Sequence, residues 1–310
     1  MRQTSAPLVS VILPFANQRV LLQDAIDSVF AQEYFDWELI LVDDGSGAAS
    51  TRVALRYARE YPARVRYCEH PYHKQNGMSA SRNLGIRQAK GDFIAFLDPT
   101  DVWFPEKLSC QVKTLLQLPT VTAAVEASLL WKSWMDESRG DTVVNVGVGE
   151  GVYEPPQLMY NCSPLSTDAL PCLSGVMMRR TSARRLLFEE AFRGLFQEYD
   201  SRAFFCKIFL EERVYVSALC HTKCRQRPLL PGVGTKSPEE GRIFFLYWFR
   251  DYLRRFPMRY HVVERMVRRA LMQYRQPYWY SLTVEWPKRM QKTVGQLGSR
   301  LVRRPYGKSG

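Results

Sequence analysis

The stretch AKGDFIAFLDPTD, from Ala89 to Asp101, contains the feature that decides the fold. Every residue from Phe93 to Leu97 is apolar, which is typical of a strand buried on both faces of a parallel sheet. Gly91 precedes this run, and Asp98 and Asp101 follow its end. The pattern predicts a central parallel strand that delivers carboxylates to one edge of a sheet.

Two further strand-like runs lie nearer the N-terminus. Val9 to Leu13 is a largely β-branched run stopped by Pro14, and the run from Trp37 to Val42 ends in Asp43 and Asp44. Apolar spacing predicts helices near 22–30, 50–61 and 80–89, and a short strand at 65–69. This alternation favours an α/β fold with a mostly parallel sheet and right-handed crossovers. Ligands in such sheets bind beyond the carboxyl ends of the strands, so both acidic clusters are expected to line one crevice.

Composition narrows the class of protein. With 310 residues and 46% hydrophobic content, the chain can bury a large core. Its apolar runs, such as Phe93 to Leu97, are far shorter than the ~20 residues of a membrane-spanning helix, so no crossing of a membrane is expected. Seven scattered cysteines do not resemble a disulfide framework and favour a cytoplasmic location. Cys220 and Cys224 are interpreted as packing thiols, because no second ligand pair stands at zinc-site spacing.

The acidic clusters suggest chemistry with a diphosphate. Asp98 and Asp101 are placed to hold Mg²⁺ or Mn²⁺ through carboxylate oxygens, and the metal would act as a Lewis acid on the phosphates. Asp43 and Asp44 could accept hydrogen bonds from a nucleobase imide or a ribose hydroxyl. Each pair taken alone could equally be a solvated turn or a helix N-cap, where Asp is common.

The joint arrangement of four blocks resembles the family 2 glycosyltransferases. The blocks are VSVILPFAN at 9–17, LILVDDGS at 39–46, SASRNLGI at 79–86 and AKGDFIAFLDPTD at 89–101. The resemblance is dense over residues 8 to about 115 and thin again near 174–228. It implies a GT-A fold, an inverting mechanism, a nucleotide-diphosphate sugar as donor and usually a divalent metal.

The resemblance also implies roles for individual residues. The nucleoside pocket would be formed by Pro14, Phe15, Asn17, Asp43 and Asp44, with Arg82, Asn83 and Asp98 beside it. Ser174-Gly175 resembles the acceptor-side loop of the family, and Arg225-Gln226-Arg227-Pro228 falls where a basic loop often closes over the pyrophosphate. His70 and His73 lie on a loop before Arg82, where they could contact phosphate, but two histidines at this spacing on a loop are interpreted as surface groups.

The sequence departs from the family pattern at two positions. Thr100, a weak neutral ligand, replaces the carboxylate that usually binds the metal most directly. Either Asp101 takes over, or Asp98 acts through water, or metal binding is impaired. We expect Asp98 and Asp101 to hold the metal together. Glu198 aligns with the catalytic base, which is an Asp in the family, and Asp200 is the second candidate. Such a base must reach the acceptor hydroxyl on the side opposite the leaving nucleotide. The alternative is a solvated acidic helix start.

The positive charge is concentrated at the C-terminus. Residues 241–310 hold 16 Lys or Arg against 3 Asp or Glu, a net +13, whereas residues 1–240 hold 27 against 28. We expect a GT-A catalytic domain over 1–235, with a donor-binding half at 1–120 and an acceptor half at 121–235. A basic aromatic helical tail would then follow over 236–310.

The tail has the composition of an interfacial segment. Two helices are expected, at 240–256 and 261–275, and the first carries Phe244, Trp248, Tyr252 and Phe256 at four-residue steps. Arginines border both helices, and Tyr278, Trp279, Tyr280 and Trp286 are suited to a head-group layer. The tail is therefore expected to bind the cytoplasmic face of an anionic membrane peripherally. The alternative is that its aromatic face packs on the catalytic domain.

These features predict an inverting hexosyltransferase that acts on a cell-surface polysaccharide, a lipid-linked glycan or a glycolipid precursor. The alternative is a catalytically impaired GT-A protein that serves as a binding or scaffold component, because Thr100 and Glu198 both depart from the pattern. No nucleic acid partner is expected, since the charge of the tail is accompanied by no recognised nucleic-acid-binding module.

Overall fold

The computed structural model describes residues 6–162, 165, 171–226, 238–257 and 259–280. The chain divides into two compact units, Met1–Gly241 and Arg242–Gly310. Each unit is described by itself below.

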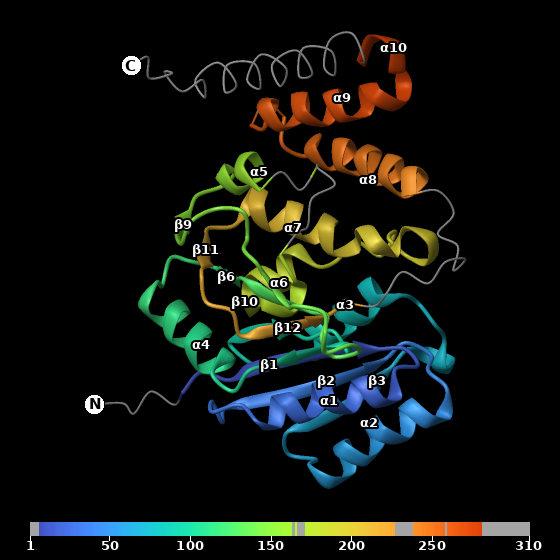
Figure 1. Cartoon of the computed structure of the whole chain (residues 1–310), viewed down its shortest axis with the longest axis vertical. Helices are drawn as coiled ribbons and strands as arrows, with labels where there is room; N and C mark the ends of the chain where they lie inside the picture. Colours follow the sequence, from blue (N-terminus) through green and yellow to red (C-terminus); the bar gives the residue numbers. More distant parts are fainter. Residues whose placement is uncertain (1–5, 163–164, 166–170, 227–237, 258, 281–310) are drawn as a thin grey trace, which may run out of the picture. The chain divides into compact units, whose positions relative to one another are not determined.

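The first unit is built on an eight-stranded sheet (Figure 1). Its strands are β1 (Val9–Phe15), β2 (Trp37–Asp43), β3 (Val65–Glu69), β4 (Phe93–Phe96), β6 (Ala123–Glu126), β9 (Gly151–Tyr153), β10 (Val176–Arg179) and β11 (Val214–Ser217). The strand order is β3-β2-β1-β4-β10-β6-β11-β9. The first four strands are parallel, as predicted. The sheet as a whole is mixed, because β10 runs antiparallel to β4 and β6, and β9 runs antiparallel to β11.

Helices cover both faces of this sheet. They are α1 (Arg19–Phe30), α2 (Ala48–Glu60), α3 (Met78–Gln88), α4 (Lys107–Gln117), α6 (Arg180–Leu186) and α7 (Asp200–Glu211). Val11 and Leu13 of β1 pack in one core with apolar residues of α1, α2 and α4. Ile12 points to the opposite face, where a Cβ on Gly85 of α3 would lie 2.4 Å from its Cγ2. Figure 1 shows α1 and α2 on one side of the strands and α6 and α7 on the other, so the unit has three α/β/α layers.

A second, four-stranded sheet stands beside the end of β4. It consists of β5 (Asp101–Trp103), β7 (Ser128–Trp131), β8 (Thr142–Val144) and β12 (Thr222–Arg225), in the order β5-β12-β7-β8. Asp101 pairs in register with Cys224 of the antiparallel strand β12. The short elements of the unit are α5 (Gln157–Asn161), η1 (Pro71–His73), η2 (Leu173–Gly175) and η3 (Gly194–Tyr199).

The second unit contains most of α8 (Pro238–Leu253), together with α9 (His261–Arg275) and α10 (Pro277–Tyr280). The predicted helix 261–275 has the observed bounds. The other ends at Leu253 instead of residue 256, because Pro257 follows and a residue before proline avoids helical backbone angles. The four-residue aromatic spacing does produce a ladder, with ring centroids 5.4 Å apart for Trp248–Tyr252 and 5.8 Å for Tyr252–Phe256.

Within the described ranges, no helix is both long enough and apolar enough to cross a bilayer.

Candidate active site

The carboxyl ends of β1, β2 and β4 lie at one edge of the sheet. The register aligns Phe15 with Asp43, and the backbone N–H of Asp44 donates to the carbonyl of Phe15 at 2.9 Å. The N–H of Leu97 donates to the carbonyl of Ile12 at 3.0 Å, which aligns the end of β4 with the same edge. The two acidic clusters therefore lie at the same edge of the sheet, as their positions after parallel strands predict.

Asp43 holds the turn that follows β2. Its Oδ1 accepts the backbone N–H of Ser46 at 2.7 Å, and its Oδ2 accepts the hydroxyls of Thr51 at 2.7 Å and Tyr67 at 3.1 Å. The carboxylate is fully buried. Asp43 thus stabilises a buried turn, so it is neither the solvated turn residue nor the helix N-cap of the alternative interpretation.

Asp44 binds the loop that precedes α3. Its Oδ1 accepts the backbone N–H groups of Asn76 at 2.8 Å and Gly77 at 3.0 Å and the hydroxyl of Ser81 at 3.1 Å. His70 Nε2 lies 2.9 Å from the same Ser81 hydroxyl and 3.7 Å from Asp44 Oδ1. His70 is therefore buried, and its interpretation as a surface group is wrong because the loop folds its ring inward against this carboxylate.

The other residues of the predicted nucleoside pocket differ in what they offer a ligand. The ring of Phe15 is fully buried in the core below the sheet edge, so only its backbone is available. Pro14 is buried as well. Asn17 has a left-handed backbone with φ of 60°, which Asn tolerates better than most residues, and its Oδ1 accepts the N–H of Gly47 at 2.6 Å. Asn17 thereby joins the turns that follow β1 and β2.

Arg82 connects the acidic residues of two distant segments. Its Nη2 donates to Asp98 Oδ1 at 2.8 Å and its Nη1 donates to Asp200 Oδ2 at 2.6 Å. The guanidinium is almost completely buried and stacks 5.1 Å from the ring centroid of Phe188. Burial alone would lower the pKa of Arg82, but the charges of Asp200 and Asp98 outweigh that effect and raise it above its ordinary value. Arg82 is therefore a fixed cation between the end of β4 and the start of α7.

Asn83 links α3 to the segment around Phe188 and Glu190. Its Nδ2 donates to the carbonyl of Phe188 at 3.0 Å and to Glu190 Oε1 at 2.8 Å, and its Oδ1 accepts the N–H of Phe188 at 2.7 Å. These three bonds tie α3 to the segment that leads into η3. They use the amide on protein partners, although the sequence predicts this residue beside a nucleoside.

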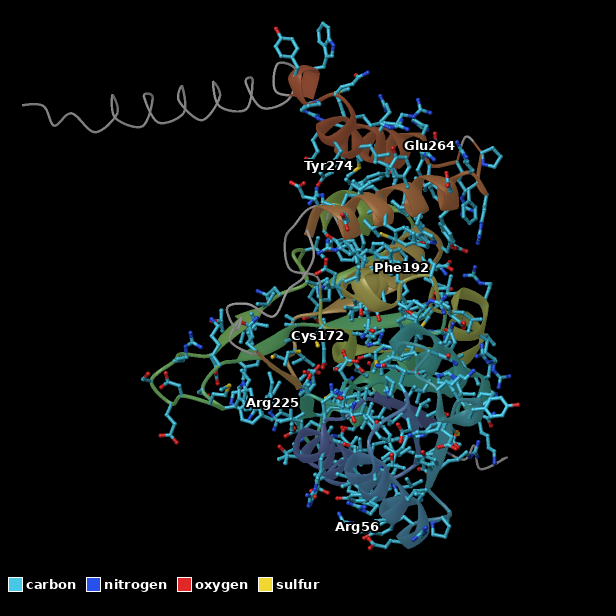
Figure 2. The ribbon with its side chains drawn as sticks, turned by 90° about the vertical axis from the view of Figure 1, so that its right-hand side faces the viewer. Arg56, Cys172, Phe192, Arg225, Glu264 and Tyr274 are labelled. Carbon is cyan, nitrogen blue, oxygen red and sulfur yellow. The ribbon has the colours of Figure 1, made fainter. Side chains whose placement is uncertain are left out.

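Asp101 points into the protein. Its Oδ2 accepts the hydroxyl of Ser174 at 2.6 Å and the thiol of Cys172 at 3.2 Å, while Ser174 Oγ also accepts the N–H of Asp98 at 3.0 Å. Burial, followed by the charge of Asp98, raises the pKa of Asp101 to about 6. Cys224 lies beside this group, and one ligand atom from each of Asp101, Cys172 and Cys224 falls within 4.8 Å of the others. Cys172 is labelled in Figure 2.

The oxygens around Asp98 have the chemistry that a hard divalent cation prefers. The side chain of Asp98 is 30% exposed and uses Oδ1 for Arg82, and Thr100 Oγ1 lies 3.4 Å from Asp101 Oδ1. Carboxylate and hydroxyl oxygens are typical ligands of Mg²⁺ and Mn²⁺. A cation here would also offset the repulsion that raises the pKa of Asp101. The donor set therefore fits the predicted metal.

The two candidate bases have different surroundings. Asp200 is buried at the start of α7, and it binds Arg82 with Oδ2 and the hydroxyl of Ser201 with Oδ1 at 2.8 Å. Glu198 is exposed on η3, and its Oε1 would lie 3.1 Å from a Cβ on Gly241. Asp200 is thus committed to Arg82, whereas Glu198 faces solvent.

A cavity of about 410 Å³ lies between the loop before α3 and η3. Asn76 and Gly77, whose N–H groups bind Asp44, form one wall, and Gln197 forms part of the other. Gly77 has φ of +93°, and a Cβ there would meet the Cβ of Arg193 at 3.1 Å. The cavity size is in the range of small-molecule sites.

The predicted basic loop is only partly described. Arg225 lies on β12 (labelled in Figure 2), where its Nη2 pairs with Asp24 at 2.5 Å and its Nη1 donates to the carbonyl of Thr100 at 3.3 Å. Its side chain is almost fully buried between these partners. Arg227 and Pro228 lie outside the described residues.

Comparison with known proteins defines the family. The profile of glycosyl transferase family 2 matches residues 10–186, more than half of the chain, and the protein belongs to this family. The putative glycosyltransferase EpsE of Bacillus subtilis is 39% identical over 111 residues, which cover 36% of this chain and 39% of EpsE. The UDP-Glc:alpha-D-GlcNAc-diphosphoundecaprenol beta-1,3-glucosyltransferase WfgD of Escherichia coli is 34% identical over 110 residues, 36% of this chain and 42% of WfgD. The matched part thus spans about two fifths of each of these relatives.

Solved structures show the same GT-A fold at low sequence identity. Staphylococcus aureus TarS 1-349 in complex with UDP-GlcNAc has a TM-score of 0.64 and 15% identity, over 89% of this chain and 76% of that one. The mannosyltransferase PcManGT from Pyrobaculum calidifontis, in complex with GDP-Man and Mn²⁺, has a TM-score of 0.55 and 18% identity, over 98% and 77%. The predicted family and fold are confirmed.

The sequence predicts neither the presence of Cys172 at the site nor the role that Ser174 takes there. Ser174 joins the backbone of Asp98 to the carboxylate of Asp101, although the motif assigned it to the acceptor side. Cys172 lies in a loop-rich stretch without periodicity, so the local pattern does not indicate that its thiol approaches Asp101. Only the partial match at Ser174-Gly175 pointed to this region.

A double-mutant cycle will measure the interaction at Arg82. We expect Arg82→Gln and Asp200→Asn to have a coupling free energy of unfolding of ~0.5–3 kcal/mol in urea denaturation, because contacting residues are rarely additive. The matched cycle of Arg82→Gln with Asp98→Asn should give a smaller coupling, since the Asp98 side chain is 30% exposed and that of Asp200 only 7%. Equal couplings, or the reverse order, would contradict this arrangement.

Proposed function

We propose that the protein transfers a sugar from a nucleotide-diphosphate donor to a hydroxyl of a glycan or lipid-linked acceptor, with inversion at the sugar carbon. The observation that carries the proposal is the pair of bonds from Arg82 to Asp98 and Asp200, which joins the strand end in the metal motif to the helix that follows Glu198. Family membership supports the reaction class. The relative WfgD, named for a diphosphoundecaprenol acceptor, and TarS with UDP-GlcNAc support the acceptor and donor classes.

The donor is proposed to bind at the edge formed by β1, β2 and β4. Asp44, Asn17 and the backbone at Phe15 would contact the nucleoside, and Arg82 and Asn83 would hold the walls in place. Because Asp44 already accepts the N–H groups of Asn76 and Gly77, its proposed contact with a nucleobase requires those bonds to be shared or exchanged. The adjoining cavity of about 410 Å³ supports this location.

A divalent cation, Mn²⁺ or Mg²⁺, is proposed to be held by Asp98 and Asp101, with Thr100 as a neutral oxygen. When bound, such a cation stabilises the negative charge that develops on the leaving nucleotide diphosphate. Arg82 would orient Asp98 for this role through the bond from its Nη2 to Asp98 Oδ1. Ser174 would fix the relative positions of residues 98 and 101 through its two hydrogen bonds.

Glu198 is proposed as the general base that takes the proton from the acceptor hydroxyl. Its carboxylate is exposed to solvent, whereas both oxygens of Asp200 are already hydrogen-bonded. Asp200 would instead position Arg82. A longer Glu in place of the usual Asp shifts the carboxylate by one methylene, so the acceptor would sit correspondingly farther from η3.

A catalytically impaired binding or scaffold protein is the second candidate. It is favoured by the orientation of Asp101, whose Oδ2 is turned toward Ser174 and Cys172, and by Thr100 in the position of the usual metal carboxylate. A protein of this kind would bind a nucleotide without turnover.

We propose that the chain consists of a catalytic domain over 1–235 and a basic tail over 236–310, as the sequence predicts. The tail would bring the enzyme to the cytoplasmic face of an anionic membrane. Exposed Tyr278 and Trp279 on α10 support this contact. The side chain of Tyr280 and residue Trp286 lie outside the described part of the chain.

Replacing Glu198 tests the base. Glu198→Gln should lower the turnover number by ~10²- to 10⁴-fold, the usual contribution of a general base, with little change in donor affinity by calorimetry. Asp200→Asn is the comparison variant, and its loss should appear chiefly as lower stability through the release of Arg82. A larger loss of turnover in a folded Asp200→Asn protein would assign the base to Asp200.

The acidity of Asp101 tests the metal site. Because the pKa of Asp101 is raised to about 6, a proton competes with the cation below that pH. Mn²⁺ affinity in calorimetric titration should therefore fall as the pH decreases from about 7 to about 5. In Asp101→Asn the affinity at neutral pH should be weaker and its pH dependence flatter, while Thr100→Asp should bind Mn²⁺ at least as well as the wild type. Unchanged affinity and slope in Asp101→Asn would remove that residue from the site.

A further inference from the structure

The C-terminal unit contains a pocket of about 430 Å³ between α8 and α9. Four arginines line it, Arg250 from α8, Arg254 directly after the end of α8, and Arg268 and Arg275 from α9, together with a single carboxylate, Glu264. Leu271 contributes an apolar, buried surface to the floor. Figure 2 labels Glu264 on this helix pair. The pocket is thus strongly cationic, with room for a small ligand.

Two of the arginines are held in place across the helix pair by Tyr247. The guanidinium carbon of Arg250 lies 4.8 Å from the centroid of the Tyr247 ring, and that of Arg275 lies 5.2 Å from it. Arg275 Nε also donates to the Tyr247 hydroxyl at 2.8 Å. Because the ring fixes both guanidiniums, their remaining N–H groups are oriented before any ligand binds, which lowers the entropy lost on binding.

The charge balance of the pocket leaves cationic donors for a ligand. Glu264 pairs with Arg268 at a distance of 3.7 Å, and Asp251, outside the pocket, pairs with Arg250 at 3.0 Å and with Arg254 at 3.2 Å. Arg250 donates to Asp251 from both Nε and Nη2. Because each arginine carries five N–H donors, these contacts still leave most of the donors unused. Four guanidiniums gathered around one hollow repel each other, and a multiply charged anion offsets that repulsion. Phosphate oxygens match the forked geometry of arginine.

The surroundings of the pocket favour a phosphate carried by a lipid. α10 begins at Pro277, two residues after Arg275, and it exposes 72% of Tyr278 and 57% of Trp279. Aromatic side chains of this kind insert at the level of lipid head groups. Because α10 contacts α9, which forms one side of the pocket, an anion in the pocket and a head-group layer around α10 would engage adjacent elements.

We propose that the pocket between α8 and α9 binds the exposed phosphate group of an anionic lipid. The inference rests on the peripheral membrane contact proposed above and adds a specific site to it. Diffuse attraction depends on net charge alone, whereas this pocket distinguishes an exposed phosphate monoester from other anionic head groups of equal charge.

The experiment measures co-sedimentation of the full chain with two kinds of phosphatidylcholine vesicles. One contains phosphatidic acid, and the other contains phosphatidylserine at a level that gives the same surface potential. Wild type should bind the phosphatidic acid vesicles roughly tenfold more strongly, the effect of about one additional charge-assisted hydrogen bond. The pocket variant is Arg268→Gln with Arg275→Gln, in which this ratio should fall to about one.

The matched control is Arg265→Gln with Arg269→Gln. Both residues are exposed on α9 and neither lines the pocket, so the control loses the same charge from the same helix. Its binding to both vesicles should weaken equally while the ratio stays at the wild-type value. A ratio that falls equally in both variants, with wild type still bound, would overturn the pocket and leave membrane contact intact.

Two further outcomes are decisive. Wild type that binds neither vesicle would overturn both the pocket and the membrane contact, independently of any transferase activity. Calorimetric titration of the full chain with inorganic pyrophosphate tests whether the pocket binds a soluble phosphate instead of a lipid phosphate. If pyrophosphate binds wild type but not the pocket variant, and the vesicle ratio of wild type is one, the site recognises a soluble phosphate and the lipid assignment is wrong.

Discussion

The buried guanidinium of Arg82 is the constraint on which the candidate site depends. It joins Asp98, at the end of a central strand, to Asp200, at the start of a helix more than a hundred residues later. Taking three charged groups out of water costs free energy, and such pairs are weak evidence for stability in themselves. Their effect here is geometric, because they fix the distance between the metal motif and the segment that carries Glu198.

A second set of hydrogen bonds lies around Arg82, Asp98 and Asp200. These bonds also fix the geometry of the site. Asn83 clamps the segment before η3, Asp44 fixes the loop before α3, and Ser174 links residues 98 and 101. Each of these side chains comes from a sequence motif, yet each binds other parts of the protein. The motifs of this chain thus build the walls of the site as well as the contacts proposed for its ligands.

The positions of the acidic clusters could be predicted from the sequence, because a buried parallel strand has an unmistakable apolar pattern and its end faces a common edge. The partners of these residues could not. Periodicity contains no information on which carboxylate meets Arg82, or that Asp101 turns toward Cys172. Those contacts join residues from distant parts of the chain, Arg82 with Asp200 and Asp101 with Cys172, which only the folded chain brings together. His70 illustrates the same limit, since a loop histidine is buried only because Asp44 and Ser81 are on the neighbouring elements.

The edge formed by the carboxyl ends of β1, β2 and β4 is proposed to bind a sugar nucleotide and to activate it. A direct test incubates the full-length protein with a panel of UDP-, GDP- and dTDP-sugars, with and without Mn²⁺, and measures release of the nucleotide diphosphate. We expect slow hydrolysis of at least one donor, faster with Mn²⁺ and strongly reduced in Asp98→Asn. Binding of a nucleotide with no hydrolysis of any donor under either condition would contradict this proposal and favour the scaffold role.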